Sequence, residues 1–107
     1  MDEIEMEKEL NKLGKSKDWA EEFKKSLFVP AYEEEYRKKW NFPNGYGISV
    51  IRGFGSYGQR EGLFEIALLK NGSLTYDKGD FKDVIGYLTP EKVVYYAKKI
   101  HRKRGRI

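Results

Sequence analysis

Residues 46–77 read YGISVIRGFGSYGQREGLFEIALLKNGSLTYD, and their pattern decides the fold class. Apolar residues alternate with small or polar ones in YGISVI (46–51), and they recur densely in LFEIALLK (63–70), which is typical of β-strands. The dipeptide Asn71-Gly72 separates LFEIALLK from SLTYD and is a strong hairpin signal. We therefore expect a three-stranded antiparallel β-meander in this part of the chain.

The hairpin around Asn71-Gly72 has two possible registers. A two-residue loop pairs Leu69 with Leu74, whereas a three-residue loop that includes Lys70 pairs Leu68 with Leu74. We favour the three-residue loop, because it gathers a larger apolar set on one face. That set comprises Phe64, Ile66, Leu68, Leu74 and Tyr76.

The glycines between the first two strands match the pattern G-x-G-x-x-G at Gly53, Gly55 and Gly58. A dinucleotide-binding loop of this pattern opens a helix, but the residues after Gly58, QREGLFEIALL, predict a turn and a strand. The glycine-rich loop of a protein kinase does lie between two strands, but Arg60 stands where that motif has valine, and H-R-D and D-F-G are both missing. We expect a hairpin connection in which glycines adopt positive φ, with no phosphate or other cofactor bound.

Catalytic and metal-binding groups are scarce in the sequence. The chain has one histidine, His101, and no cysteine, so neither a histidine-based nucleophile nor a thiolate metal site is expected. Asp77, Asp80 and Asp83 surround Gly79, but their spacing does not match a calcium loop. We expect a protein that is not an enzyme.

Upstream of the strands, residues 1–40 predict a helical N-terminal part. We expect helices over about 3–13, 17–27 and 30–40, with Ser16 as an N-cap and Pro30 in a first turn. Aromatic and apolar residues recur at i, i+4 and i+8 in the second and third helices, which is typical of one helix face. These stripes are Trp19, Phe23 and Leu27, and Tyr32, Tyr36 and Trp40. The sequence leaves open whether the Tyr32 stripe packs in the core or faces a partner.

Downstream, the sequence TPEKVVYYAKKIHRK predicts a C-terminal helix. Thr89 is its expected N-cap, Pro90 occupies the first turn, and Val93, Ala97 and Ile100 form its inner face. The preceding GDFKDVIGYL fits either helical spacing or a short extended segment. The expected fold class is α+β: N-terminal helices, a three-stranded antiparallel meander and a C-terminal helix packed on the sheet. We expect a single domain, 1–107, with the sheet and last helix in 45–100 and a basic tail at 101–107.

Composition and charge distribution indicate where in the cell the protein is expected and where its positive charge lies. No apolar run is long enough to cross a membrane, and MDEIEMEKEL lacks the apolar core of a signal peptide, so we expect a cytoplasmic protein. The net charge is +4, and residues 98–107 alone hold six lysines and arginines with no acidic residue. The excess positive charge is therefore expected at the C-terminus rather than in a groove of the folded body.

Two segments are candidates for partner binding. The glycine loop is longer than a hairpin needs and carries Phe54 and Tyr57 beside Arg52 and Arg60, a combination that suits recognition of another protein. The C-terminal candidates are Arg102, Lys103, Arg104 and Arg106. These cations suit an acidic protein surface or, as the alternative function, largely non-specific binding of nucleic-acid phosphates, and they also keep a chain in solution.

The middle and C-terminal part of the chain resembles small uncharacterised proteins of bacteriophages and prophages. The resemblance covers about residues 45–93 and rests on GYGISVIRGFGSYG (45–58), GLFEIALLKNG (62–72), LTYD (74–77) and DVIGYLTPEKV (83–93). It implies no catalytic or binding residues. It does imply a small protein that acts by binding, for example an inhibitor or modulator of a host protein in a defence or nucleic-acid-processing complex.

Overall fold

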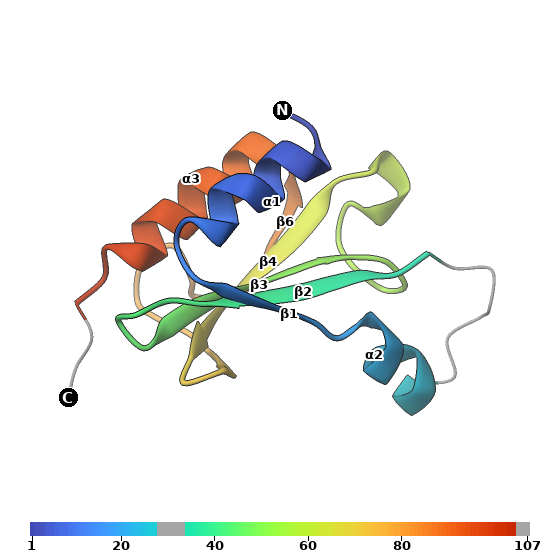
Figure 1. Ribbon diagram of the computed structural model, residues 1–107. Helices are drawn as coiled ribbons and strands as arrows, with labels where there is room; N and C mark the ends of the chain where they lie inside the picture. Colours follow the sequence, from blue (N-terminus) through green and yellow to red (C-terminus); the bar gives the residue numbers. More distant parts are fainter. Residues whose placement is uncertain (28–33, 105–107) are drawn as a thin grey trace.

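The computed structural model describes residues 1–27 and 34–104 as one antiparallel sheet of six strands with three α-helices (Figure 1). The helices are α1 (Glu3–Asn11), α2 (Ala20–Leu27) and α3 (Pro90–His101). The strands are β1 (Lys15–Asp18), β2 (Tyr36–Asn41), β3 (Tyr46–Arg52), β4 (Phe64–Lys70), β5 (Ser73–Thr75) and β6 (Ile85–Leu88). β1 to β4 are neighbours in chain order, and β5 and β6 both pair with the other side of β4. The expected α+β class with an antiparallel sheet is confirmed, but the sheet has six strands rather than three.

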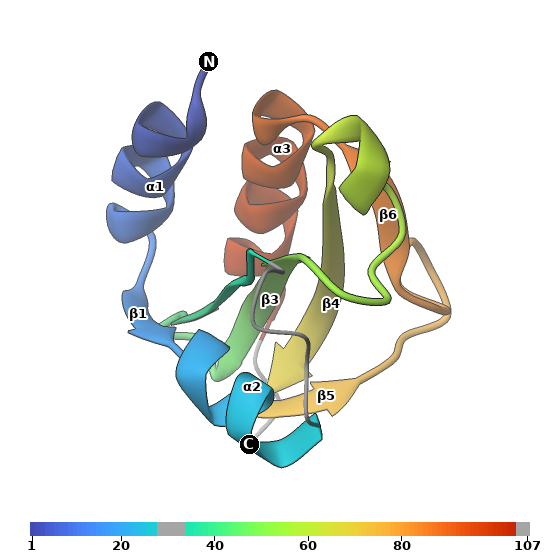
Figure 2. The same ribbon diagram turned by 90° about the vertical axis from the view of Figure 1, so that its right-hand side faces the viewer.

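Helices α1 and α3 lie side by side on one face of the sheet, and α2 lies on the other (Figures 1 and 2). The core fills the space between the sheet and the α1–α3 layer. Its members from the strands are Trp40, Ile48, Val50, Phe64, Ile66, Leu68 and Leu88, and those from the helices are Met6, Leu10, Val93, Val94, Ala97 and Ile100. None of the helices in the described part of the chain has the length and apolarity to cross a bilayer.

The C-terminal helix forms as the sequence predicts. The side chain of Thr89 accepts a hydrogen bond from the amide of Lys92 at 3.4 Å, and Pro90 occupies the first turn. Val93, Ala97 and Ile100 are fully buried toward the sheet and α1. Of the segment 79–88, whose conformation the sequence leaves open, the last four residues form the short strand β6 and the residues before them form turns and bends.

Residues 36–40 do not belong to a helix, so the prediction of a third helix and of a wholly helical residue range 1–40 is wrong. They form β2, in which Tyr36, Lys38 and Trp40 face the helices and Arg37 and Lys39 face the opposite side. Spacing of i and i+4 marks one face of a strand as well as one face of a helix, and tyrosine and tryptophan favour strands. Trp40 is therefore a core residue, whereas Pro30 and Tyr32 lie outside the described residues.

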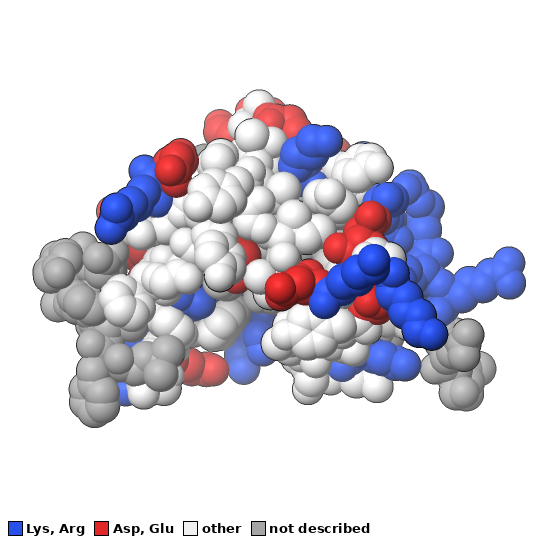
Figure 3. All heavy atoms as spheres, turned by 180° about the vertical axis from the view of Figure 1, so that it is seen from behind, with Lys and Arg blue, Asp and Glu red and all other residues white. Residues whose placement is uncertain are grey.

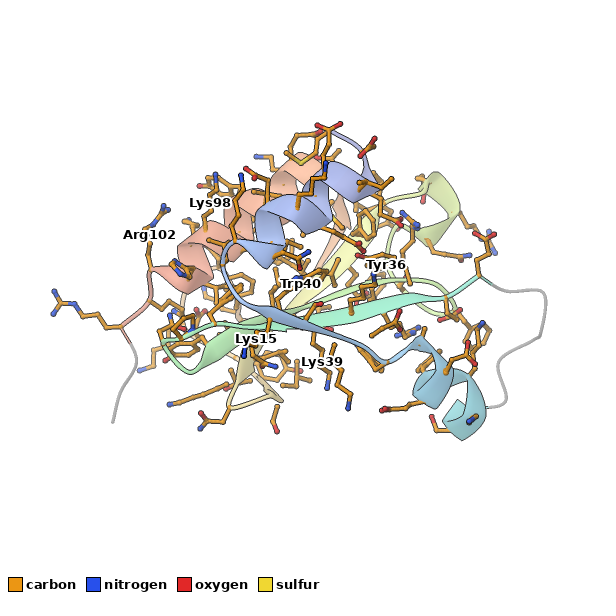
Figure 4. All side chains as sticks on the ribbon, in the orientation of Figure 1. Lys15, Tyr36, Lys39, Trp40, Lys98 and Arg102 are labelled. Carbon is orange, nitrogen blue, oxygen red and sulfur yellow. The ribbon has the colours of Figure 1, made fainter. Side chains whose placement is uncertain are left out.

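β2 is attached to α1 by polar side chains as well as by packing (Figure 4). The hydroxyl of Tyr36 donates to Glu7, the ammonium of Lys38 lies 2.8 Å from the same carboxylate, and Trp40 Nε1 donates to Asn11 at 2.9 Å. Burial, followed by the hydrogen bond to Glu7, raises the pKa of Tyr36 far above its ordinary value. Tyr36, Lys38 and Trp40, which the sequence analysis assigned to a helix, thus connect β2 to α1.

Ser16 is not an N-cap, because it lies within β1 and pairs with Trp40. The chain enters α2 through Asp18, whose side chain accepts from the amide of Ala20 at 2.9 Å. Trp19 and Phe23 do lie on one side of the α2 segment, with ring centroids 6.0 Å apart and rings nearly perpendicular. The second predicted helix is thus present, but it begins at Ala20 after a strand that the sequence did not reveal.

The register expected for the Asn71-Gly72 hairpin is also wrong. Leu69 pairs with Leu74 across a two-residue turn, in which φ is 52° at Asn71 and 82° at Gly72. Two successive positive φ values are those of a type I′ turn, whose twist matches that of the strands. Leu69 is buried on the face opposite the main core, and Leu74 is exposed. The hairpin register therefore cannot be chosen by placing the largest number of apolar side chains on one face.

Candidate recognition loop

Residues 53–63 connect β3 to β4, and we call this segment the recognition loop. Phe54 and Tyr57 are half or more exposed, at 50% and 60%. Tyr87 of β6, 59% exposed, borders the loop, and the three rings line an open pocket of about 700 Å³ together with Arg60. The loop therefore brings together three aromatic side chains, one of which, Tyr87, the sequence analysis missed.

A buried ion pair holds the start of the recognition loop. Arg37 Nε lies 2.8 Å from Glu35 Oε1, and the two side chains are 5% and 0% exposed. Glu35 Oε2 accepts from the amide of Phe54 at 2.8 Å, and Arg37 Nη2 donates to the carbonyl of Phe54 at 2.9 Å. Both backbone groups of Phe54 are thus bonded to one pair of charges, which holds the backbone position from which the Phe54 ring projects.

Helix α2 closes over the outer side of this ion pair. The guanidinium carbon of Arg37 lies 3.3 Å from the centre of the Phe23 ring and 5.4 Å from that of Trp19. A guanidinium that stacks on an aromatic face is stabilised and shielded from water. The helix on the second face of the sheet therefore supports the loop indirectly, through Arg37.

The middle of the recognition loop is fixed by bonds to β4 and β6. The amide of Tyr57 donates to Glu65 Oε1 at 2.9 Å, and its carbonyl accepts from the amide of Tyr87 at 3.2 Å. Contact between Tyr57 and β6 is so close that a Cβ added to Gly86 would lie 2.4 Å from Tyr57 Cβ. Tyr87 itself adopts φ 59°, a left-handed conformation that is uncommon for an aromatic residue and that clusters at functional sites.

Each of the three glycines has a role in this loop geometry. Gly55 and Gly58 have φ values of 78° and 98°, as expected, whereas Gly53 is required because a Cβ would lie 2.4 Å from the carboxylate of Glu35. The amides of Gly53 and Phe54 already donate to Ser56 Oγ and Glu35. After Gly58 the chain makes one 3-10 turn, Gln59–Glu61, and enters β4. The predicted return of the chain as a strand is confirmed.

The structure separates the other predicted partner-binding residues from the loop. Arg52 turns toward the helices, where Nη2 lies 2.7 Å from Glu3 and the guanidinium carbon lies 4.5 Å from the centre of the Phe64 ring. Arg102, Lys103 and Arg104 follow α3 at the other end of the molecule (Figure 1), and Arg106 lies outside the described residues. Phe54, Tyr57 and Arg60 line the pocket of the recognition loop, and the other described candidates, Arg52, Arg102, Lys103 and Arg104, do not.

Glu35 and Arg37 are further residues that sequence reasoning missed. As positions i and i+2 they share one face of an extended segment, but the helical interpretation placed them on different faces. Among the described residues, no three histidine, aspartate or glutamate side chains are grouped to hold a metal ion. The buried charges of Glu35 and Arg37 are paired with each other, and the aromatic rings of Phe54, Tyr57 and Tyr87 are exposed.

Comparison with known proteins assigns no family to this arrangement. A scan of protein-family models, a search of curated proteins and a search of solved structures found no match to the chain. The site residues and their contacts therefore carry the functional inference.

Proposed function

We propose that the protein is a non-enzymatic binding protein that engages a partner protein through the recognition loop. The observation that supports this proposal is the rigid display of Phe54, Tyr57 and Tyr87 at half or greater exposure. Aromatic side chains dominate the energetics of protein interfaces. A backbone held before binding also costs less conformational entropy at association.

The partner is proposed to be a protein with an uncharged contact surface. The face of the molecule seen in Figure 3 has few charged groups in its middle, and the charges that border the loop, Arg60 and Glu61, are of opposite sign. The resemblance to bacteriophage and prophage proteins makes a host protein the first partner to test. Modulation or inhibition of that host protein is the activity we propose.

The proposal can be tested by affinity capture from bacterial lysate with three immobilised forms of the chain. We expect wild type and Tyr76→Ala to retain the same partner, and Phe54→Ala/Tyr57→Ala to lose it. Tyr76 is a matched control, because it is 54% exposed but follows β5, away from the loop. With the partner purified, each loop substitution is expected to weaken binding by about 2 kcal/mol or more. Equal capture by the loop variant and wild type, with unchanged circular dichroism, would refute the proposal.

A further inference from the structure

The end of the molecule opposite the recognition loop gathers cationic side chains, and we call it the basic end: Lys70, Lys98, Arg102, Lys103 and Arg104. β4 connects the two regions, since Phe64 lies beside the loop and Lys70 at the opposite end of the strand. Seven residues of strand span about 20 Å. Figure 3 shows blue side chains concentrated at the side of the molecule where α3 ends.

The backbone of the basic end is anchored as far as Lys103, within the segment 101–107 for which the sequence predicts a basic tail. The side-chain amide of Asn44, in the β2–β3 turn, donates to the carbonyls of Ile100 at 2.9 Å, His101 at 3.2 Å and Lys103 at 2.8 Å. The rings of Phe42 and His101 also meet, with centroids 5.7 Å apart. The chain is therefore held as far as Lys103, which fixes where the cations project.

Most positive charge at the basic end is not neutralised by acidic groups. Lys103 is the exception, because its ammonium lies 3.1 Å from the carboxylate of Asp77. Burial alone would raise the pKa of Asp77, but the contact with Lys103 and the amides of Gly79 and Phe81 lower it below its ordinary value. Within residues 1–27 and 34–104, no ion pair engages the other four: Lys70, Lys98, Arg102 and Arg104.

Four of these cations form two groups, one beside the ring of Tyr46 and one on α3. The ammonium groups of Lys70 and Lys103 lie 5.7 Å and 5.5 Å from the centre of the same ring, that of Tyr46. Lys98 and Arg102, one helical turn apart, project from the same side of α3 (Figure 4). Unpaired like charges at one end of a protein repel one another, so a multivalent anion that binds there gains affinity by relieving that repulsion.

We propose that the basic end binds the phosphate backbone of nucleic acid without sequence preference. Nucleic acid is favoured over an acidic protein because its phosphate charges are regularly spaced, so one strand can contact cations from β4, from α3 and from the residues after α3 together. Two of the free cations are also arginines, which bind phosphate oxygens in a bidentate manner. This inference does not depend on the recognition loop. If both proposals hold, the protein contacts a partner protein at one end and nucleic acid at the other.

Fluorescence anisotropy with a labelled random-sequence DNA duplex tests the inference. Four free cations predict a slope of log K against log salt of about −3.6, which is about 150-fold weaker binding at 200 mM than at 50 mM salt. The variant Arg102→Ala/Arg104→Ala should bind more weakly and show about half that slope. The control Lys8→Ala/Lys25→Ala removes the same charge from exposed sites on α1 and α2 and should retain nearly the full slope.

Two further measurements separate this inference from its rivals. The loop variant Tyr57→Ala should bind the duplex as wild type does, so failure of one proposal leaves the other standing. Polyglutamate should compete only weakly with the duplex. The inference is overturned if no binding occurs at low salt, if the Lys8/Lys25 control weakens binding as much as the Arg102/Arg104 variant, or if polyglutamate binds more tightly than DNA.

Discussion

Replacing Arg37 with methionine should destabilise the protein strongly, because it leaves the carboxylate of Glu35 buried without its partner. The substitution removes the contact to Glu35 at 2.8 Å, the bond to the Phe54 carbonyl at 2.9 Å and the stacking on Phe23. Hydrogen bonds of charged groups contribute about 1.5–3 kcal/mol each, and breaking a buried ion pair on one side costs about 3–5 kcal/mol. We expect the free energy of unfolding to fall by about 4 kcal/mol.

Urea denaturation monitored by tryptophan fluorescence and circular dichroism measures this loss. The double variant Glu35→Leu/Arg37→Met should lose less than Arg37→Met alone, about 1–3 kcal/mol, because no buried charge is left without a partner and only the bonds to the Phe54 backbone are missing. Lys39→Met is the matched control, since Lys39 lies on the same side of β2 and stacks on Trp19 at 5.3 Å but is only half-buried. It should cost less than about 1 kcal/mol. Equal losses for Arg37→Met and Lys39→Met would refute the anchoring role of the ion pair.

Three other predictions concern the loop, the end of α3 and the attachment of α1. Gly86→Ala should cost about 1–3 kcal/mol in urea denaturation, because its Cβ would lie 2.4 Å from Tyr57 Cβ. Gly79→Ala, whose nearest contact would be 3.7 Å, should be close to neutral, and equal costs would contradict the close packing of loop and β6. Asn44→Ala should cost about 1–3 kcal/mol and speed amide hydrogen exchange in the last turn of α3; unchanged exchange would count against the anchor. Because the pKa of Tyr36 is raised in the folded state, its contribution is complete below the ordinary tyrosine pKa and declines above it. The stability difference between wild type and Tyr36→Phe should therefore shrink above about pH 10, by up to about 1.4 kcal/mol per pH unit, and a constant difference would exclude the linkage.

The parts of the fold that sequence reasoning predicted are those with strong local signals. The N-cap and proline that open α3 are read from adjacent residues, and the strands of the meander follow from their own alternation. β2 has no such signal, because its apolar positions are only Tyr36 and Trp40, with lysines between them. Its strand conformation is decided by pairing with β3, which is a contact between distant segments.

The sequence predicted two of the exposed aromatic residues of the candidate site but not the buried residues that support them. Phe54 and Tyr57 follow from the length and composition of the glycine loop, whereas the support beneath them depends on tertiary contacts. Tyr87 reaches the loop because β6 pairs with β4, and Arg37 reaches it because β2 pairs with β3, the strand that leads into the loop. Both contacts join segments that are far apart in the sequence, so no local pattern predicts them. The residues that support the loop can therefore be identified only from the structure.

The outer edge of β1 has a consequence for how the protein behaves at high concentration. This strand is four residues long, all of them exposed, and in the described part of the chain it pairs with β2 alone. An unpaired edge is a template on which a second copy can add its own strand. Two of its four side chains are Lys15 and Lys17, so stacking copies edge to edge would bring ammonium groups together and stop chains from joining into fibrils.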